Sequence, residues 1–120
     1  MKIIVSASGQ TLGAQIDPRF GRAAFFIAVD TDTNTFVAHD NVQNLNAAQG
    51  AGIQSAETVS RIGGEVVITG HCGPKAFKTL SAAGIKVVVG AQGTVADAIA
   101  AFKSGALVPT DAANVEGHWV

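Results

Sequence analysis

The sequence predicts a single α/β domain in which helices flank a mixed, five-stranded sheet. Two strand–helix units follow one another over residues 65–84 and 86–105, and strands that are joined through helices run parallel. Two strand-like segments over residues 23–39 predict an antiparallel hairpin. Apolar residues make up 48% of the 120-residue chain and charged residues 14%, which is enough apolar material for one core.

The first half of the chain supplies the first three predicted strands. Residues 2–7 are apolar and mostly β-branched, which is typical of a strand buried on both faces. The strand-like segments 23–30 and 35–39 are separated by the turn formers of residues 31–34. Residues 8–21 between the first two strands contain several glycines and a proline without any periodicity. Long irregular loops of this kind in small domains are frequently functional.

A polar stretch and the first helix follow the hairpin. Residues 40–52 are rich in Asn and Gln, and we expect a second functional loop there. Helical spacing begins at Ile53, and the pair Gly63-Gly64 predicts the end of the helix. The apolar stripe of this predicted helix consists of Ile53, Ala56, Val59 and Ile62.

The second half of the chain repeats a strand and a helix. Residues 65–70 and 86–90 read as buried strands, and Gly73-Pro74 introduces the helix after the first of them. Thr94 and Asp97 have the spacing of a capping box at the start of the last helix, and a glycine follows each helix. The apolar stripes of the two helices are Ala76, Leu80 and Ala83, and Val95, Ala98, Ile99 and Phe102.

Charge and cysteine content exclude several classes of protein. The formal net charge is −1, so no global positive field attracts nucleic acid or an anionic membrane. The only cysteine is Cys72, which excludes an internal disulfide and a zinc site built from several thiolates. Residues 1–6 are too short and too weakly charged for a signal peptide, and no stretch approaches the ~20 apolar residues of a membrane span. We therefore expect a cytoplasmic protein of one domain, residues 1–120, with a loosely held tail at residues 108–120.

The loops after the parallel strands predict an anion-binding site. In an open α/β sheet these loops gather at one edge, where ligands bind, and helix N-termini there offer N–H groups and partial positive charge. We expect three helix starts at that edge. The alternative is that the glycines merely turn the chain and the cationic side chains are solvated. The candidate residues for binding are Arg19, Arg22, Thr69, Gly70, His71, Cys72, Gly73, Lys75, Gly93 and Thr94.

Cys72 and His71 are candidate metal ligands. A cysteine at a helix N-terminus has a stabilised thiolate, which suits metal binding, and the imidazole of His71 is a further ligand of suitable softness. However, a lone cysteine also often acts as a small buried apolar residue, and the sequence leaves both alternatives open. The sequence lacks the motifs of P-loop, α/β-hydrolase, metalloprotease and dinucleotide-binding proteins, and no pair of acidic residues is placed for acid–base work.

Four motifs resemble a known family over about residues 1–107. Residues 16–22 (IDPRFGR), 50–54 (GAGIQ), 67–77 (VITGHCGPKAF) and 90–95 (GAQGTV) are similar, in this order, to the dinitrogenase iron–molybdenum cofactor biosynthesis family, which includes NifX, NafY and the C-terminal part of NifB. The resemblance implies a ribonuclease H-like fold and a non-enzymatic role in carrying or protecting a metal–sulfur cluster. Within the family, the likeness is greatest to the orange-protein group of sulfate-reducing bacteria, which implies a non-covalently held molybdenum–copper sulfide cluster.

The sequence is compatible with three functions. The first is a carrier for an anionic metal–sulfur cluster, either a molybdenum–copper sulfide or an iron–molybdenum-cofactor-like cluster. The second is an interaction module that docks on a partner ATPase or a cluster-assembly protein, with incidental metal binding. The third, an enzyme acting on a small phosphorylated molecule, ranks last. A ribonuclease H-type nuclease is disfavoured, because residues 2–7 hold no acidic residue for its metal ions.

Overall fold

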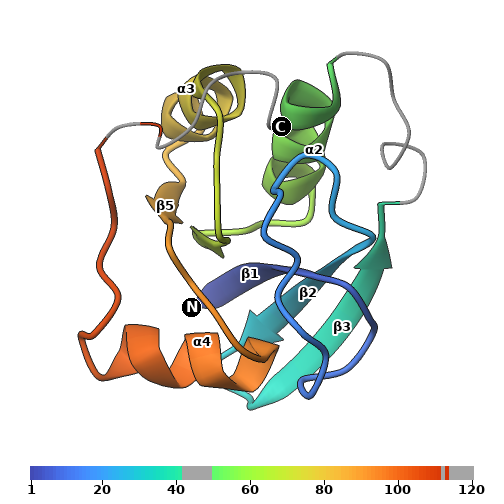
Figure 1. Cartoon of the computed structure of the whole chain (residues 1–120), viewed down its shortest axis with the longest axis vertical. Coiled ribbons are helices and arrows are strands. Elements are labelled where there is room, and N and C mark those ends of the chain that lie inside the picture. The colour runs from blue at the N-terminus through green and yellow to red at the C-terminus, as the bar shows by residue number, and fades with distance from the viewer. Residues whose placement is uncertain (42–49, 112, 114–120) are drawn as a thin grey trace.

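The computed structural model describes residues 1–41, 50–111 and 113, and its helices and strands are shown in Figure 1. The predicted order of strands and helices is confirmed in these residues. In chain order the elements are β1 (Lys2–Ala7), β2 (Phe25–Asp30), β3 (Thr35–Asp40), α2 (Ala51–Arg61), β4 (Val66–Ile68), α3 (Pro74–Ala82), β5 (Lys86–Val88) and α4 (Val95–Lys103).

The strands form the mixed, five-stranded sheet that the sequence predicts, and their order in the sheet is β3-β2-β1-β4-β5. β2 pairs antiparallel with both β1 and β3, whereas β4 pairs parallel with both β1 and β5. β1, β3, β4 and β5 therefore all point the same way and end at one edge, which we call the carboxyl edge. The segments that follow β1, β4 and β5 are brought together there.

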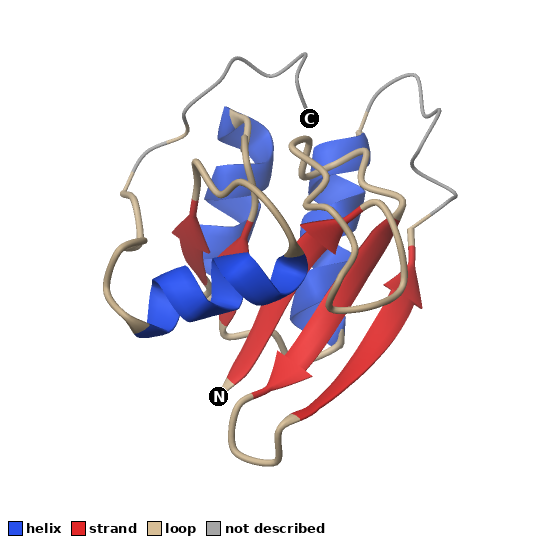
Figure 2. Cartoon of the chain, turned by 60° about the horizontal axis from the view of Figure 1, so that its bottom comes forward, coloured by secondary structure: helices blue, strands red, loops and turns tan. Residues whose placement is uncertain are grey.

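Helices cover both faces of the sheet. Figures 1 and 2 show α2 and α3 on one face and α4 on the other. Alternate residues of β1 serve the two faces, because Ile4 packs into the core under α2 and α3 while Ile3 and Val5 pack under α4. All three of these side chains are at most 1% exposed. The expectation that the first strand is buried on both faces is confirmed.

Helix α2 differs from its prediction. It begins at Ala51 rather than Ile53, because Gly50 adopts a left-handed conformation (φ +79°) and its carbonyl accepts the first helical hydrogen bond, from Gln54 N. Small residues of this helix face the core, whereas Ile53 is 36% exposed. The predicted apolar stripe was therefore wrong at Ile53. In α3 it was wrong at Ala83, which is exposed just beyond the last helical residue.

The C-terminal segment is attached to the sheet at Thr110. The Thr110 N–H donates to the carbonyl of Val87 at 2.8 Å, which attaches the chain to the outer side of β5. The prediction of a loosely held tail falls largely on residues 112 and 114–120, and that of a second functional loop on residues 42–49. These residues lie outside the described part of the chain. Among the helices of the described part, none combines the length and the apolar content that crossing a bilayer requires.

Candidate anion-binding site

The long segment after β1 crosses the carboxyl edge and joins both later strand–helix loops. The His71 N–H donates to the Pro18 carbonyl at 2.7 Å, and the Phe20 N–H donates to the His71 carbonyl at 3.2 Å. Further back, the Ile16 N–H donates to the Gly93 carbonyl at 2.9 Å. The two bonds of His71 form a short parallel bridge between Arg19 and His71, and the Ile16 bond belongs to an antiparallel bridge between Gln15 and Thr94. The structure therefore brings together the backbone segments that the sequence placed at one site.

A buried pair of hydroxyl groups fixes this crossing. The Ser6 hydroxyl lies 2.7 Å from both the Asp17 carbonyl oxygen and the Thr69 hydroxyl, and Ser6 and Thr69 are fully buried. The Asp17 N–H donates to the Ser6 carbonyl at 3.0 Å. Buried polar groups that satisfy one another hold the chain in one arrangement. Thr69 therefore supports the site from beneath, and Ser6, which the sequence did not single out, does the same.

Gly70 makes the close crossing sterically possible. A Cβ atom at this position would lie 2.8 Å from the Pro18 Cα and 3.0 Å from the Pro18 carbonyl oxygen. Both distances are shorter than an ordinary van der Waals contact with backbone, so a side chain here would displace the Pro18 segment. Gly70 is thus a packing position beneath the site.

The two arginines of the crossing segment are held differently. Arg19 is half-exposed, and its Nε lies 3.9 Å from Asp17 Oδ1, which also accepts the Arg19 backbone N–H at 3.1 Å. Asp17 is 8% exposed and was missed as a site residue by the sequence reasoning. Arg22 is partly buried and follows Gly21, whose carbonyl accepts a hydrogen bond from Ser55 of α2 at 2.9 Å. The crossing segment is thus anchored to α2 as well.

Two helices begin at the carboxyl edge without side-chain caps. Neither α2 nor α3 has a side-chain hydrogen bond to its first-turn N–H groups or an acidic residue in its first turn. Gly73 is the N-cap of α3, Pro74 occupies its first turn, and Lys75 adds an exposed positive charge. Uncapped N–H groups and the positive end of the helix dipole favour a bound anion.

Helix α4 differs and corrects one expectation. The predicted capping box is confirmed: the Thr94 N–H donates to Asp97 Oδ2 at 3.0 Å, and the Asp97 N–H donates to the Thr94 hydroxyl at 3.1 Å. Hydrogen bonding of the Asp97 carboxylate to the Thr94 backbone N–H, and second to the Thr94 side chain, lowers the pKa of Asp97. The expectation of three free helix starts was therefore wrong at α4. The backbone of Gly93 (φ +86°) packs over this carboxylate, so Gly93 and Thr94 do not offer an unopposed positive end.

The Cys72 side chain points into the core, away from the site. Cys72 is fully buried in the same apolar cluster as Phe20 and Ala76. Burial raises the pKa of its thiol to about 12, which is the reverse of the stabilised thiolate that the sequence suggested. Of the two alternatives that the sequence left open for Cys72, its burial in the core supports the small apolar residue. His71, its neighbour, is partly exposed and lies in the bridge to Arg19.

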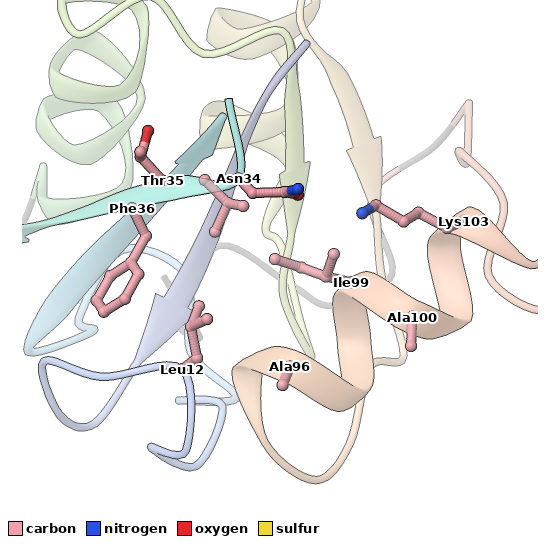
Figure 3. A pocket seen from close by; sticks show the side chains of 9 residues that line it. Leu12, Asn34, Thr35, Phe36, Ala96, Ile99, Ala100 and Lys103 are labelled. Atoms are coloured by element: carbon pink, nitrogen blue, oxygen red, sulfur yellow. The ribbon is translucent and has the colours of Figure 1, made fainter. Parts of the chain in front are cut away.

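In the described residues, the carboxyl edge has cationic side chains and main-chain N–H donors. Residues 1–41, 50–111 and 113 contain no group of three or more His, Cys, Asp or Glu side chains that could hold a metal ion. An open apolar groove of about 360 Å³ lies elsewhere, between the β2–β3 hairpin and α4 (Figure 3), and none of the predicted site residues lines it. The edge is chemically suited to an anion that is held by charge and hydrogen bonds.

Comparison with known proteins identifies the family. The family model described as "Dinitrogenase iron-molybdenum cofactor" matches residues 1–105. The chain belongs to this family. The resemblance drawn from the four sequence motifs is thereby confirmed, and the family match spans β1 to the end of α4.

Solved structures of similar proteins share the fold. The apo form of the orange protein from Desulfovibrio gigas is 40% identical, with a TM-score of 0.92 over 95% of this chain and 96% of that one. An NMR structure of a putative NifB protein from Thermotoga is 33% identical, with a TM-score of 0.84 over 97% and 98%. A curated protein of Methanocaldococcus jannaschii, named as uncharacterized, is 26% identical over 78% of this chain and 80% of its own length. The mixed sheet with flanking helices is therefore the fold of the orange protein, and the ribonuclease H-like label stays a prediction.

Proposed function

We propose that this chain is a non-enzymatic carrier of a small anionic metal–sulfur cluster, bound along the carboxyl edge of the sheet. One observation carries the proposal. The segment bearing Arg19 and Arg22 is fixed by backbone hydrogen bonds to the loop that opens the uncapped N-terminus of α3. Membership of a family described by a molybdenum-containing cofactor supports an anionic cluster as the cargo.

The chemistry of a thiometallate fits these groups. Its sulfides accept hydrogen bonds, and its multiple negative charge is attracted to guanidinium groups and helix N-termini. We assign direct contact to Arg19, Arg22 and Lys75 and to the amide groups that follow Gly73, with His71 as a candidate metal ligand. Thr69 and Gly70 then act by positioning the crossing segment. Such a cluster needs no covalent link to the protein.

The composition of the cluster and the partner are part of the same proposal. The resemblance of the sequence motifs to the orange-protein group implies a molybdenum–copper sulfide, and the 40% identity to an orange protein supports that resemblance. The family description makes an iron–molybdenum-cofactor-like cluster the second candidate. Similarity to a putative NifB protein favours a cluster-assembly protein as the partner, with an ATPase as the alternative. We propose that the chain exchanges the cluster with this partner in the cytoplasm.

The carrier function predicts retention of a coloured cluster. Metal-free protein mixed with tetrathiomolybdate and a copper salt is expected to keep the colour above an ultrafiltration membrane. The two metals should be retained in a fixed ratio to protein, measured by elemental analysis. The same mixture with protein unfolded in urea is the control, and its colour should pass the membrane. If the folded protein also leaves all colour in the filtrate, the carrier proposal is wrong.

Replacing Cys72 separates core packing from ligation. Cys72→Ala is expected to lower the free energy of unfolding by about 1 kcal/mol, because a buried sulfur is lost from the core. Retained colour per folded protein should stay within about twofold of the parent, which corresponds to under 0.5 kcal/mol of binding energy. Denaturant unfolding and ultrafiltration measure the two effects. A folded variant that no longer retains colour would show that the thiol turns outward and ligates.

A further inference from the structure

β3 is an open edge of the sheet. It is the terminal strand of the order β3-β2-β1-β4-β5, and within the described residues it pairs with β2 alone. The opposite edge is different, because Thr110 covers the outer side of β5 with a hydrogen bond to Val87. An open edge presents a row of main-chain N–H and C=O groups that can pair with another strand.

The side chains at the centre of β3 do not protect this edge, and the one charged residue of the strand, Asp40, lies at its end. Residues 33–39 contain no Asp, Glu, Lys, Arg or Pro, the residues that usually prevent edge-to-edge pairing. Phe36 is 42% exposed and Val37 57% exposed. Phe36 pairs with Val29 and lies on the α4 face of the sheet, whereas Val37 pairs with Ala28 and lies on the α2–α3 face. Both faces of the edge are therefore apolar at its centre.

An apolar surface extends inward from Phe36. The groove of Figure 3 continues from the Phe36 ring past Leu12 to Ile99 of α4, with the charged group of Lys103 at its far end. Phe36 consequently stands at the boundary between the open strand edge and a concave apolar surface. β3 is six residues long, and the apolar groove lies next to it. A partner strand could therefore make main-chain contacts with β3 and side-chain contacts with the groove.

We propose that β3 is the interface for a second copy of this chain, with the two β3 strands paired antiparallel about a two-fold axis. Such an axis is normal to the sheet. The residue on the axis faces the same residue of the partner, and a residue on one side of it faces the partner's residue that is equally far on the other side. With Val37 on the axis, Phe36 faces the partner's Ala38, and Thr35 faces the partner's His39. The apolar side chains then meet apolar side chains on both faces of the joined sheet.

The same register is favoured by charge. It sets the carboxylate of Asp40 beside the amide of the partner's Asn34, so no two like charges meet. Moving the axis to Ala38 would place Phe36 opposite the partner's Asp40. Moving it to Phe36 would place Val37 opposite the partner's Thr35. Of these three registers, the β3 edge is most complementary to a second β3 strand when Val37 lies on the axis. We therefore infer that the partner at this edge is a second copy of the chain.

Disulfide trapping tests the register. In the proposed dimer the Cβ atoms at position 37 lie about 5 Å apart, within reach of a disulfide after small adjustments. Val37→Cys is expected to form a covalent dimer under mild oxidation, seen on a non-reducing gel and by mass spectrometry. Val108→Cys, at another exposed valine (65%), should remain mostly monomeric. The native Cys72 is fully buried and leaves the engineered thiol as the reactive group in the described part of the chain.

Sedimentation tests the contact without a new cysteine. One strand pair makes a small interface, so we expect a Kd of about 0.1 mM and a dimer fraction that grows up to about 0.5 mM protein. Val37→Lys should raise the Kd at least about tenfold by placing two like charges on the axis, whereas Val108→Lys should leave it unchanged. A wild-type mass that stays at 12.1 kDa throughout, or equal trapping at positions 37 and 108, would overturn the proposal. Dimerisation that survives Val37→Lys would assign it to another surface and also overturn the proposal.

Discussion

Replacing Arg19 and Arg22 together with alanine is expected to weaken thiometallate binding by about 10- to 100-fold. A charge-assisted hydrogen bond contributes about 1.5–3 kcal/mol, and solvent screening at the half-exposed Arg19 reduces its share. The loss should appear as an increased Kd in a titration followed by absorbance. The fold should persist, because the backbone bonds of this segment do not depend on the two guanidinium groups.

A matched control separates local charge from net charge. Arg61 and Lys103 lie in the last turns of α2 and α4, away from the carboxyl edge, so Arg61→Ala with Lys103→Ala removes the same two positive charges. We expect this control to change the Kd by no more than about threefold at an ionic strength of about 0.15 M, where distant charges are screened. Equal losses in the two double variants would show that only the overall charge attracts the cluster, and the proposed site would be wrong.

The sequence predicts the fold well because its determinants are local. Alternation of apolar strands with helical stripes, and a glycine after each helix, fixes the order of elements and hence the parallel strands. The start of α2 escapes such reasoning, because its first residues, Ala51 and Gly52, are small and buried and precede the apolar spacing that begins at Ile53. The topology also predicts that the loops after β1, β4 and β5 meet, since parallel strands end at one edge.

The individual roles at the site depend on contacts that a sequence does not display. In the sequence, Ser6 is one more strand residue and Asp17 is one more loop residue. In the structure, the Ser6 hydroxyl contacts the backbone of the crossing segment, and the Asp17 carboxylate lies beside Arg19. A signal for Ser6 exists, since it is a polar residue within an otherwise apolar strand and meets Thr69 at the end of β4. Successive side chains of an extended segment point to opposite sides, so His71 and Cys72 cannot both face the same ligand. In the structure, the Cys72 side chain is the one that points into the core.

Gly70→Ala is expected to lower both the free energy of unfolding and the affinity for thiometallate, and its combined effect should be the largest of the substitutions considered. The added Cβ would lie 2.8 Å from the Pro18 Cα, and because the neighbour is backbone, the crossing segment must move. Overpacking of this kind costs about 1–3 kcal/mol, which denaturant unfolding would measure as a lower midpoint with an unchanged slope. Displacing Pro18 also strains the 2.7 Å bond from His71 and carries Arg19 away from α3, so thiometallate binding should fall in the protein that remains folded.

The control for this prediction is a glycine in the same crossing segment with space around it. A Cβ at Gly13 would meet only the Thr11 hydroxyl, at 3.8 Å, so Gly13→Ala should change the free energy of unfolding by less than about 0.5 kcal/mol and leave binding intact. Because Gly70 offers no group to a ligand beyond its backbone, weaker binding in Gly70→Ala would report on the position of the segment that carries Arg19. A folded Gly70→Ala protein that binds as tightly as the parent would show that this crossing does not shape the site.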